Sequence, residues 1–350
     1  MKSGTWKDVL QAPKPFPLRD CATMGIRQLA WKTMGSQAGG TKVDLVGVGL
    51  NATDTVIPVS AFPAPGSKTE YSERSVLLGG EISTAVIACR RWGLRTRYIG
   101  RLGDDHAARL HRAAFDDVGV ETRIVTVEDA SSPQSLILVD DSGERTVLCH
   151  RDPRLTMQPG DIEREWISSA RALLVDGYHT TAAICAATWA RDAGIPVIAD
   201  LDVLRPGIDD LMPLVDYAFA SREFPAALTG EPNLKKALAM LQEQFHCRLA
   251  GVTLGVGGVL TWDGEQSIQR PAYRVSTVDT TGAGDLFHAG FVYGHLQGWP
   301  IERQLDYACA AAALNCTRAG ARGHIGTVKE ISRLMAESKR YDVAACAETR

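Results

Sequence analysis

Residues 278–298 read VDTTGAGDLFHAGFVYGHLQG, a glycine-rich loop that runs directly into a stretch with the apolar spacing of a helix. Gly282 and Gly284 would let the backbone approach a ligand closely. The N–H groups of residues 282–285 would lie at the positive end of the helix dipole, so the loop predicts an anion site that suits a phosphate group. Beside it, Asp285 could accept a proton from an attacking hydroxyl group.

A plain helix cap followed by a tight turn would explain the same residues one at a time, with Thr281 or Asp285 as the capping residue. The whole string is more specific than its parts. Its six fixed positions, D-T-x-G-A-G-D, should occur by chance about 10^-5 times in a chain of this length. We therefore interpret the string as a functional motif.

Outward from this loop, short apolar runs alternate with longer segments of helical spacing, beginning at Val43. The alternation predicts an α/β fold built from βαβ units with short connections. The expected strands are 43–49, 96–103, 171–178, 195–202, 215–221 and 249–255. The expected helices are 82–93, 104–118, 181–193, 232–245 and 285–297.

Two regions interrupt the alternation, residues 54–78 and 131–150, and both contain β-like stretches. In the second region, the turn Asp140-Asp141-Ser142-Gly143 joins two alternating runs and predicts a hairpin. We expect the two regions to pair into a small sheet that stands off the main domain.

Composition and charge exclude several classes of protein. With 350 residues, 45% of them hydrophobic and 23% charged, the chain is typical of a globular protein. A net charge of −3 gives no positive field for nucleic acid or an anionic membrane. Neither nucleic acid nor a membrane is therefore expected as a partner. No apolar run approaches the 18 residues that a membrane-spanning helix needs, and we expect a cytoplasmic location. The eight cysteines are dispersed, which indicates reduced, mostly buried thiols.

Residues 1–42 differ from the rest of the chain. They carry seven Lys or Arg against two acidic residues, and three closely spaced prolines. The positive charge could suggest a transit peptide, but the segment is poor in Ser and Arg. We expect an N-terminal extension outside the main domain.

The string at 279–285 resembles the C-terminal signature of the PfkB (ribokinase-like) carbohydrate kinase family. Gly79-Gly80 with the helix after it is similar to the N-terminal signature of that family, and 47–54 (GVGLNATD) to its sugar-binding first strand and turn. Residues 252–258 are similar to its nucleotide-binding strand, and 310–321 to its closing helix and loop. The resemblance covers residues 43–340 and leaves 1–42 and 341–350 outside.

This resemblance implies a three-layer αβα domain with a mostly parallel sheet, and a β-sheet lid from segments 54–78 and 131–152. It implies an ATP-dependent sugar kinase that acts on a ketohexose or pentose, or on an acidic sugar, and uses Mg2+ and a monovalent cation, usually K+. The implied site residues are Asp285 as the base; Gly282, Ala283 and Gly284 as the anion hole; Asp54, Asn51, Gly79, Gly80 and Thr84 around the sugar; Thr253, Gly255, Gly258, Ser221 and Glu223 around the nucleotide; and Asp279, Thr281, Ala319 and Gly320 around the monovalent cation.

Two departures from the family pattern bear on the substrate and the metal. Ribokinases carry Gly-Gly-Lys-Gly-Ala-Asn, whereas residues 79–84 read GGEIST, which exchanges a lysine donor for an acidic residue and argues against ribose. The family's Asn-x-x-Glu, which helps to place Mg2+, is replaced by residues 221–224 (SREF). Glu223 could substitute from one position away.

Several alternatives stay open at this stage. Arg145, His150 and Arg151 could bind an anionic group on the sugar, or they could be charges on an exposed lid strand. Asp200 and Asp202 end an expected strand and could lie near the cleft or cap a loop. A nucleoside kinase or a non-catalytic sugar or nucleotide sensor would share the fold. Exposed lid edges predict a homodimer through the lids. Three single histidines elsewhere, His106, His111 and His246, are expected at helix surfaces.

Overall fold

The computed structural model describes residues 42–141 and 145–342. The predictions for the N-terminal extension and for most of the C-terminal tail therefore lie outside the described residues, as does part of the predicted 140–143 turn. In the described part, no helix is long and apolar enough to cross a membrane.

The larger sheet has nine strands within the described residues, in the order β13-β12-β11-β10-β9-β8-β1-β4-β5. Neighbours from β11 through β5 pair in parallel, and β12 and β13 add an antiparallel edge. All six predicted strands are confirmed, whereas β5, β12 and β13 were not predicted. The strands are β1 (Leu45–Val48), β4 (Thr96–Gly103), β5 (Glu121–Val127), β8 (Ala172–Asp176), β9 (Val197–Leu201), β10 (Tyr217–Ala220), β11 (Leu249–Thr253), β12 (Val259–Trp262) and β13 (Ser267–Arg270).

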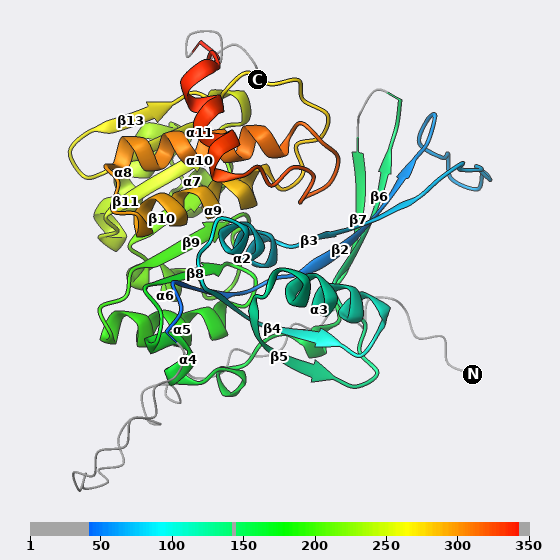
Figure 1. Ribbon diagram of the computed structural model, residues 1–350, viewed down its shortest axis with the longest axis horizontal. Coiled ribbons are helices and arrows are strands. Elements are labelled where there is room, and N and C mark those ends of the chain that lie inside the picture. Colours follow the sequence, from blue (N-terminus) through cyan, green and yellow to red (C-terminus); the bar gives the residue numbers. More distant parts are fainter. Residues whose placement is uncertain (1–41, 142–144, 343–350) are drawn as a thin grey trace, which may run out of the picture. The chain divides into compact units, whose positions relative to one another are not determined.

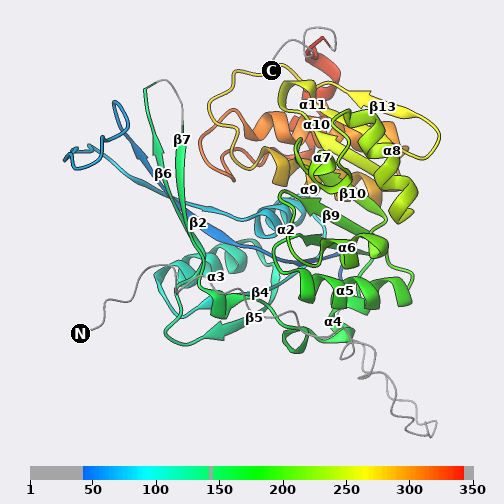
Figure 2. The same ribbon diagram turned by 180° about the vertical axis from the view of Figure 1, so that it is seen from behind.

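Helices cover both faces of this sheet, as Figure 1 and Figure 2 show from opposite sides. Successive residues of a strand point to opposite faces of the sheet and pack in two separate hydrophobic cores. In β8, Leu174 packs with one set of helices, and Leu173 and Val175 pack with the other. The three-layer αβα arrangement is confirmed. The first core is covered by α2 (Glu81–Arg91), α3 (His106–Val118), α9 (Ala283–Leu296), α10 (Ile301–Asn315) and α11 (Val328–Glu337), and the second by α4 (Arg164–Ser168), α5 (Thr180–Asp192), α6 (Ile208–Leu211), α7 (Phe224–Thr229) and α8 (Leu234–Phe245).

A second, four-stranded sheet has the order β3-β2-β6-β7 and is the expected lid. Its strands are β2 (Ala52–Pro58), β3 (Ser75–Gly79), β6 (Gln134–Val139) and β7 (Arg145–His150). The two predicted segments join through β2 and β6, which pair in parallel, while the outer pairs are antiparallel. Figure 1 shows the lid strands extending away from the helical layers.

Burial corrects the prediction for His111 and agrees with the prediction that most cysteines are buried. His111 does not lie at a helix surface: it is fully buried, and its Nε2 lies 3.1 Å from the hydroxyl of Thr53 at the base of the lid. No disulfide joins the cysteines of the described residues, where five are buried and Cys149 is exposed.

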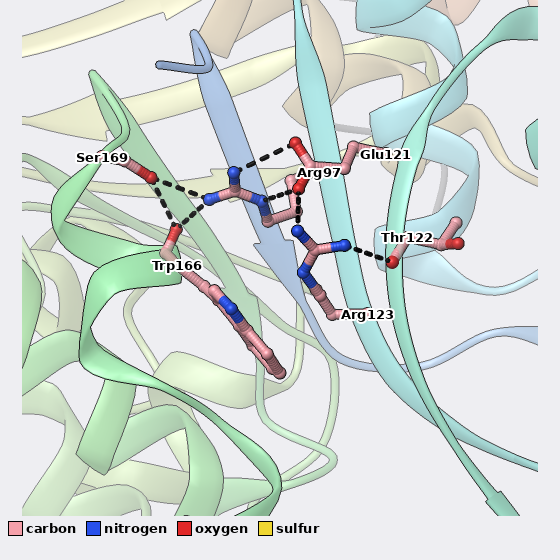
Figure 3. A network of polar contacts seen from close by, with 6 residues as sticks. All are labelled: Arg97, Glu121, Thr122, Arg123, Trp166 and Ser169. Atoms are coloured by element: carbon pink, nitrogen blue, oxygen red, sulfur yellow. Dashed lines mark hydrogen bonds and ion pairs between the residues drawn. The ribbon is translucent and has the colours of Figure 1, made fainter. Parts of the chain in front are cut away.

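A polar network around the buried Arg97 connects the first residues of β4 and β5 at one edge of the large sheet (Figure 3). Arg97 on β4 donates two hydrogen bonds of 3.0 Å to the Glu121 carboxylate on β5, and a third of 2.8 Å to the hydroxyl of Ser169. Arg123 lies 2.6 Å from the same carboxylate and stacks over the ring of Trp166. These contacts hold the edge strand against the segment that contains α4.

Candidate active site

The predicted anion loop opens helix α9. Gly282 caps the helix with φ 75°, and a Cβ atom there would lie 2.2 Å from the carbonyl oxygen of Ala321, so only glycine fits. The N–H of Ala283 donates a hydrogen bond of 3.2 Å to the carbonyl oxygen of Thr280. Among the described residues, no other backbone group accepts from the N–H groups of 282, 284 and 285, and the N–H of Asp285 interacts with the carboxyl group of its own residue. These N–H groups lie at the start of the helix, where they could donate to an anion.

Asp285 lies in the first turn of α9, beside these donors. Burial raises the pKa of its carboxyl group to about 7; the charge of Arg322 opposes this, and the charge of Asp54 on the lid adds to it. A hydrogen bond with Thr84 also lowers the pKa. A carboxyl group with a pKa near neutrality is suited to accept a proton from an alcohol and release it later.

Arg322 was not among the residues predicted from the sequence, yet it joins the two halves of the site. Its Nε donates to the Thr84 hydroxyl at 3.2 Å, and its Nη2 donates to the Ser83 hydroxyl at 2.8 Å and to the Gly79 carbonyl oxygen at 3.2 Å. Burial lowers the pKa of Arg322 to about 10 against the opposing charge of Asp285, so the guanidinium stays charged at neutral pH.

The residues proposed for a monovalent cation lie together. Asp279 Oδ1 accepts hydrogen bonds from the backbone N–H of Thr281 at 2.9 Å and from its hydroxyl at 2.7 Å. The other oxygen, Oδ2, accepts from the N–H of Gly320 at 2.8 Å, and Ala319 directly precedes it. Asp279 therefore ties the anion loop to the loop after α10.

A second tie between the same loops comes from Asn315, another residue that sequence reasoning missed. It is fully buried at the end of α10. Its Nδ2 donates to the carbonyl oxygens of Thr281 at 2.9 Å and Ala321 at 3.2 Å. Because Ala321 also crowds Gly282, this amide fixes the distance between the anion loop and Arg322.

The predicted sugar residues form a floor and a lid wall. Asn51 is buried, and its Nδ2 donates to Tyr98 Oη at 2.7 Å, while its Oδ1 has no hydrogen-bond partner among the described residues. Gly80 has φ 94°, and a Cβ atom there would lie 2.3 Å from the Cα atom of Asn51. Asp54 faces Ser135 across the β2–β6 pair, and burial raises its pKa. A Cβ atom on Gly79 would lie 3.0 Å from Oδ2 of Asp54.

Acidic residues gather at the carboxyl ends of β8 and β9. Burial raises the pKa of Glu81 well above its usual value, and the charges of Asp176 and Asp200 raise it further. Burial likewise raises the pKa of Asp200, followed by the charge of Asp285. Of the two aspartates for which a place near the cleft or in a loop cap was left open, Asp200 is buried close to the base, and Asp202 is exposed.

His288 links this acidic group to the anion loop. Its Nδ1 lies 3.0 Å from the Asp200 carboxylate and 2.8 Å from the carbonyl oxygen of Gly284. Burial lowers the pKa of His288 to about 4, so the ring is neutral at pH 7. The imidazole therefore positions the loop and does not add a charge to it.

The predicted nucleotide residues lie after β10 and β11, on the same sheet edge as Asp176 and Asp200. Thr253 ends β11, and Gly255 and Gly258 have φ 56° and 74°. Ser221 donates from its hydroxyl to the Asp202 carbonyl oxygen at 2.6 Å. Glu223 is exposed and caps α7.

Of the two alternatives for Arg145, His150 and Arg151, the structure agrees with charges on an exposed lid strand, because every residue of β7 is exposed and the three side chains do not lie in one cluster. Arg145 begins β7 and donates to the Thr281 hydroxyl at 3.0 Å, so the lid contacts the anion loop there. Arg151 follows the other end of the strand, roughly 20 Å away at 3.3 Å per residue, and donates to Tyr178 Oη at 3.2 Å. His150 is exposed.

Comparisons with known proteins agree with this geometry. Residues 43–327 match the model of the pfkB family of carbohydrate kinases. The ATP-dependent ribose-1-phosphate kinase of Halopiger xanaduensis is 31% identical over 264 residues, which cover 74% of this chain and 87% of the relative. The 5-dehydro-2-deoxygluconokinase of Geobacillus thermodenitrificans is 26% identical over 262 residues, covering 68% and 77%. The structure of Arabidopsis thaliana ribokinase complexed with ribose and ATP matches with a TM-score of 0.73 and 25% identity, covering 84% of this chain and 99% of that one.

Proposed function

The chain belongs to the pfkB family of carbohydrate kinases, which are phosphotransferases with an alcohol acceptor, and we propose that it transfers the γ-phosphate of ATP to a hydroxyl group of a pentose, a ketohexose or an acidic sugar. The observation that carries this proposal is Asp285, with a pKa of about 7, beside three N–H donors of the anion loop.

In this proposal, Asp285 takes the proton of the sugar hydroxyl as that oxygen attacks the γ-phosphate. The N–H groups of residues 282, 284 and 285 stabilise the charge on the phosphoryl group in transit. Arg322 holds Thr84 against the base and keeps the pKa of Asp285 from rising further. Asn315 and Asp279 keep the loop in place, so little reorganisation is needed at the moment of transfer.

The sugar would lie between the floor and the lid. Asn51 Oδ1 is a buried acceptor without a partner among the described residues, which supports a hydrogen bond from a sugar hydroxyl. Asp54, Gly79 and Gly80 would complete the contacts. Glu81 replaces the lysine of ribokinases, and burial raises its pKa, which favours the protonated carboxyl group, a group that can donate as well as accept.

The adenine nucleotide would lie along Thr253, Gly255, Gly258 and Ser221, and Mg2+ would bridge the β- and γ-phosphates and neutralise their charge. In the described residues no cluster of three or more His, Cys, Asp or Glu side chains could hold a metal. This fits an Mg2+ ion that keeps most of its water and binds through the phosphates, with Glu223 as an outer contact.

A monovalent cation such as K+ fits the oxygen donors of Asp279, Thr281, Ala319 and Gly320, because hard cations prefer oxygen ligands. When bound there it would add positive field beside the anion loop. Asp279 and Gly320 already connect the two loops in its absence, so a requirement for K+ would act on the rate rather than on folding.

We also propose that two copies associate through their lids. Thr55 pairs with both Val76 and Leu136, and Leu136 pairs with Leu148, so one row of side chains crosses one face of the lid sheet. Val76, Leu136 and Leu148 are 48%, 37% and 57% exposed. A second copy would bury this apolar row. Sedimentation velocity should give a dimer mass that Leu148→Asp reduces to a monomer; a monomer for the unaltered chain would exclude the dimer.

The kinase proposal is tested by ADP release from ATP, Mg2+ and K+ with pentoses, ketohexoses, sugar acids and nucleosides. We expect turnover on a carbohydrate that Asp285→Asn lowers by about 10^2- to 10^4-fold. Turnover on nucleosides alone would make the protein a nucleoside kinase. Sugar binding without ADP release would indicate a sensor instead.

A further inference from the structure

Two arginine side chains from distant parts of the chain contact one tyrosine ring beside the sugar residues. The guanidinium carbon of Arg205 lies 3.9 Å from the ring centre of Tyr178, and that of Arg151 lies 5.4 Å from it. Arg151 also donates from Nε to Tyr178 Oη at 3.2 Å. Tyr178 follows β8, Arg205 follows β9, and Arg151 follows the lid strand β7, so three elements bring these groups together.

Neither guanidinium is paired with a carboxylate in the described part of the chain. Arg151 donates from Nη1 only to carbonyl oxygens, those of Gln134 at 3.1 Å and His150 at 3.0 Å. Arg205 has its contact with the ring but no hydrogen bond or ion pair within the described residues. Nearby arginines differ: Arg154 lies 2.6 Å from Asp152, and Arg101 lies 3.4 Å from Asp161.

The pair is directly connected to the sugar floor. Asp176 accepts a hydrogen bond from the N–H of Tyr178 at 2.9 Å with one oxygen and from the N–H of Leu50 at 2.6 Å with the other. Leu50 directly precedes Asn51. On the lid side, Arg151 is close enough to Asp54 for its charge to lower the pKa of that carboxyl group, against the larger effect of burial.

Both arginines are half-buried, and Tyr178 is too. A cation held over an aromatic ring keeps its N–H donors in a fixed direction, which reduces the entropy lost when they bind a ligand. Two guanidinium groups without a direct ion pair, held around one ring, repel each other, and an anion that binds beside them would relieve that repulsion. Paired guanidinium donors match the oxygen geometry of phosphate and carboxylate groups.

We propose that Arg151 and Arg205, held by Tyr178, bind an anionic substituent on the sugar, a phosphate or a carboxylate group, so that the substrate of this enzyme is a charged sugar. This inference rests on the proposed function and names the substrate class of the same site. It separates the two ends of the substrate: the hydroxyl group that is phosphorylated meets Asp285, and the anion meets the arginine pair.

The first test compares sugars with and without an anionic group: ribose with ribose 1-phosphate, and glucose with gluconate. The ratio of kcat/KM for the charged sugar over the neutral one should exceed tenfold and should fall at least tenfold in Arg205→Gln and in Arg151→Gln. Arg205→Lys should retain part of the preference, since it keeps the charge but loses the planar fork. Arg154→Gln, an exposed arginine with its own aspartate, is the matched control and should leave the ratio unchanged. The phosphate and carboxylate pairs together tell which anion is preferred.

A second test does not depend on turnover. Calorimetric titration without ATP should detect ribose 1-phosphate or gluconate binding to the unaltered protein, and the Arg151→Gln/Arg205→Gln double variant should bind the same ligand at least tenfold more weakly. Equal binding by the double variant, or equal kcat/KM for charged and neutral sugars, would overturn the inference. Asp285-dependent turnover without a charge preference would support the kinase proposal and exclude the anion site. Arginine-dependent binding without any ADP release would support the anion site and exclude the kinase proposal.

Discussion

Arg322 donates a hydrogen bond of 3.2 Å to the hydroxyl group of Thr84, which is itself hydrogen-bonded to the Asp285 carboxyl group. The same guanidinium donates to the carbonyl oxygen of Gly79, the last residue of lid strand β3. One side chain therefore contacts the end of the lid and sets the electrostatic environment of the proposed base. A movement of β3 would shift Arg322 and so change the electrostatic environment of Asp285.

Replacing Arg322 by Gln should shift the pH dependence of the rate. The charge of Arg322 lowers the pKa of Asp285, which burial raises to about 7. Without that charge the pKa rises, so the base is protonated over a wider range and the acid limb of kcat/KM moves to higher pH. A pH–rate profile measures the shift. Arg318→Gln, an exposed arginine in the same loop, should keep the original profile, and an unmoved limb in Arg322→Gln would contradict this account.

Asp285→Asn should stabilise the protein at alkaline pH while it removes activity. A carboxyl group whose pKa is raised on folding binds its proton more tightly in the folded state. Its destabilising effect is therefore absent below about pH 4 and grows until the pH passes about 7. Thermal melts should show the variant gaining stability over the unaltered protein between pH 5 and pH 8. An equal difference at both pH values would mean that the carboxyl group is not perturbed.

Local patterns explain why the anion loop could be predicted and why its neighbours could not. Gly282 and Asp285 belong to one continuous string whose geometry is set by a turn and a helix start. Arg322 and Asn315 reach the same place from another part of the chain, and no local spacing marks them. The hairpin of β12 and β13 did carry a usable signal, because Asp263 accepts hydrogen bonds from the N–H groups of Glu265 and Gln266 in the turn between the strands.

The wrong expectation for His111 and the separation of Arg145 from Arg151 have the same physical origin. His111 has the spacing of a helix-surface residue, but the lid strand that covers it at Thr53 is more than fifty residues away in the sequence. Arg145 and Arg151 were grouped because they are close in sequence, yet an extended strand separates its ends by roughly 20 Å. Arg151 instead contacts the ring of Tyr178, which Arg205 also contacts, and only the packing of the lid on the sheet creates this arrangement.

Glu81→Gln should keep most of the activity at pH 7. Burial and neighbouring carboxylates raise the pKa of Glu81 well above its usual value, which favours the protonated carboxyl group, and an amide of the same shape preserves its donor and its acceptor. Glu81→Ala should raise KM for the sugar about tenfold, because one or two hydrogen bonds are lost. Steady-state kinetics distinguish the two. A Gln variant as impaired as the Ala variant would show that Glu81 acts as an anion.

Arg97→Met should lower stability without changing kcat. Arg97 is 2% exposed and holds Glu121 through two hydrogen bonds, near the first residues of β4 and β5 (Figure 3). Removing it leaves a carboxylate with only Arg123 as a partner, which should reduce the free energy of unfolding by about 3 kcal/mol. Arg95→Met removes an ion pair with Asp44 from a side chain that is 57% exposed, and should lower stability by less than about 1 kcal/mol. Urea unfolding measures both variants, and equal losses would contradict the role assigned to the buried network.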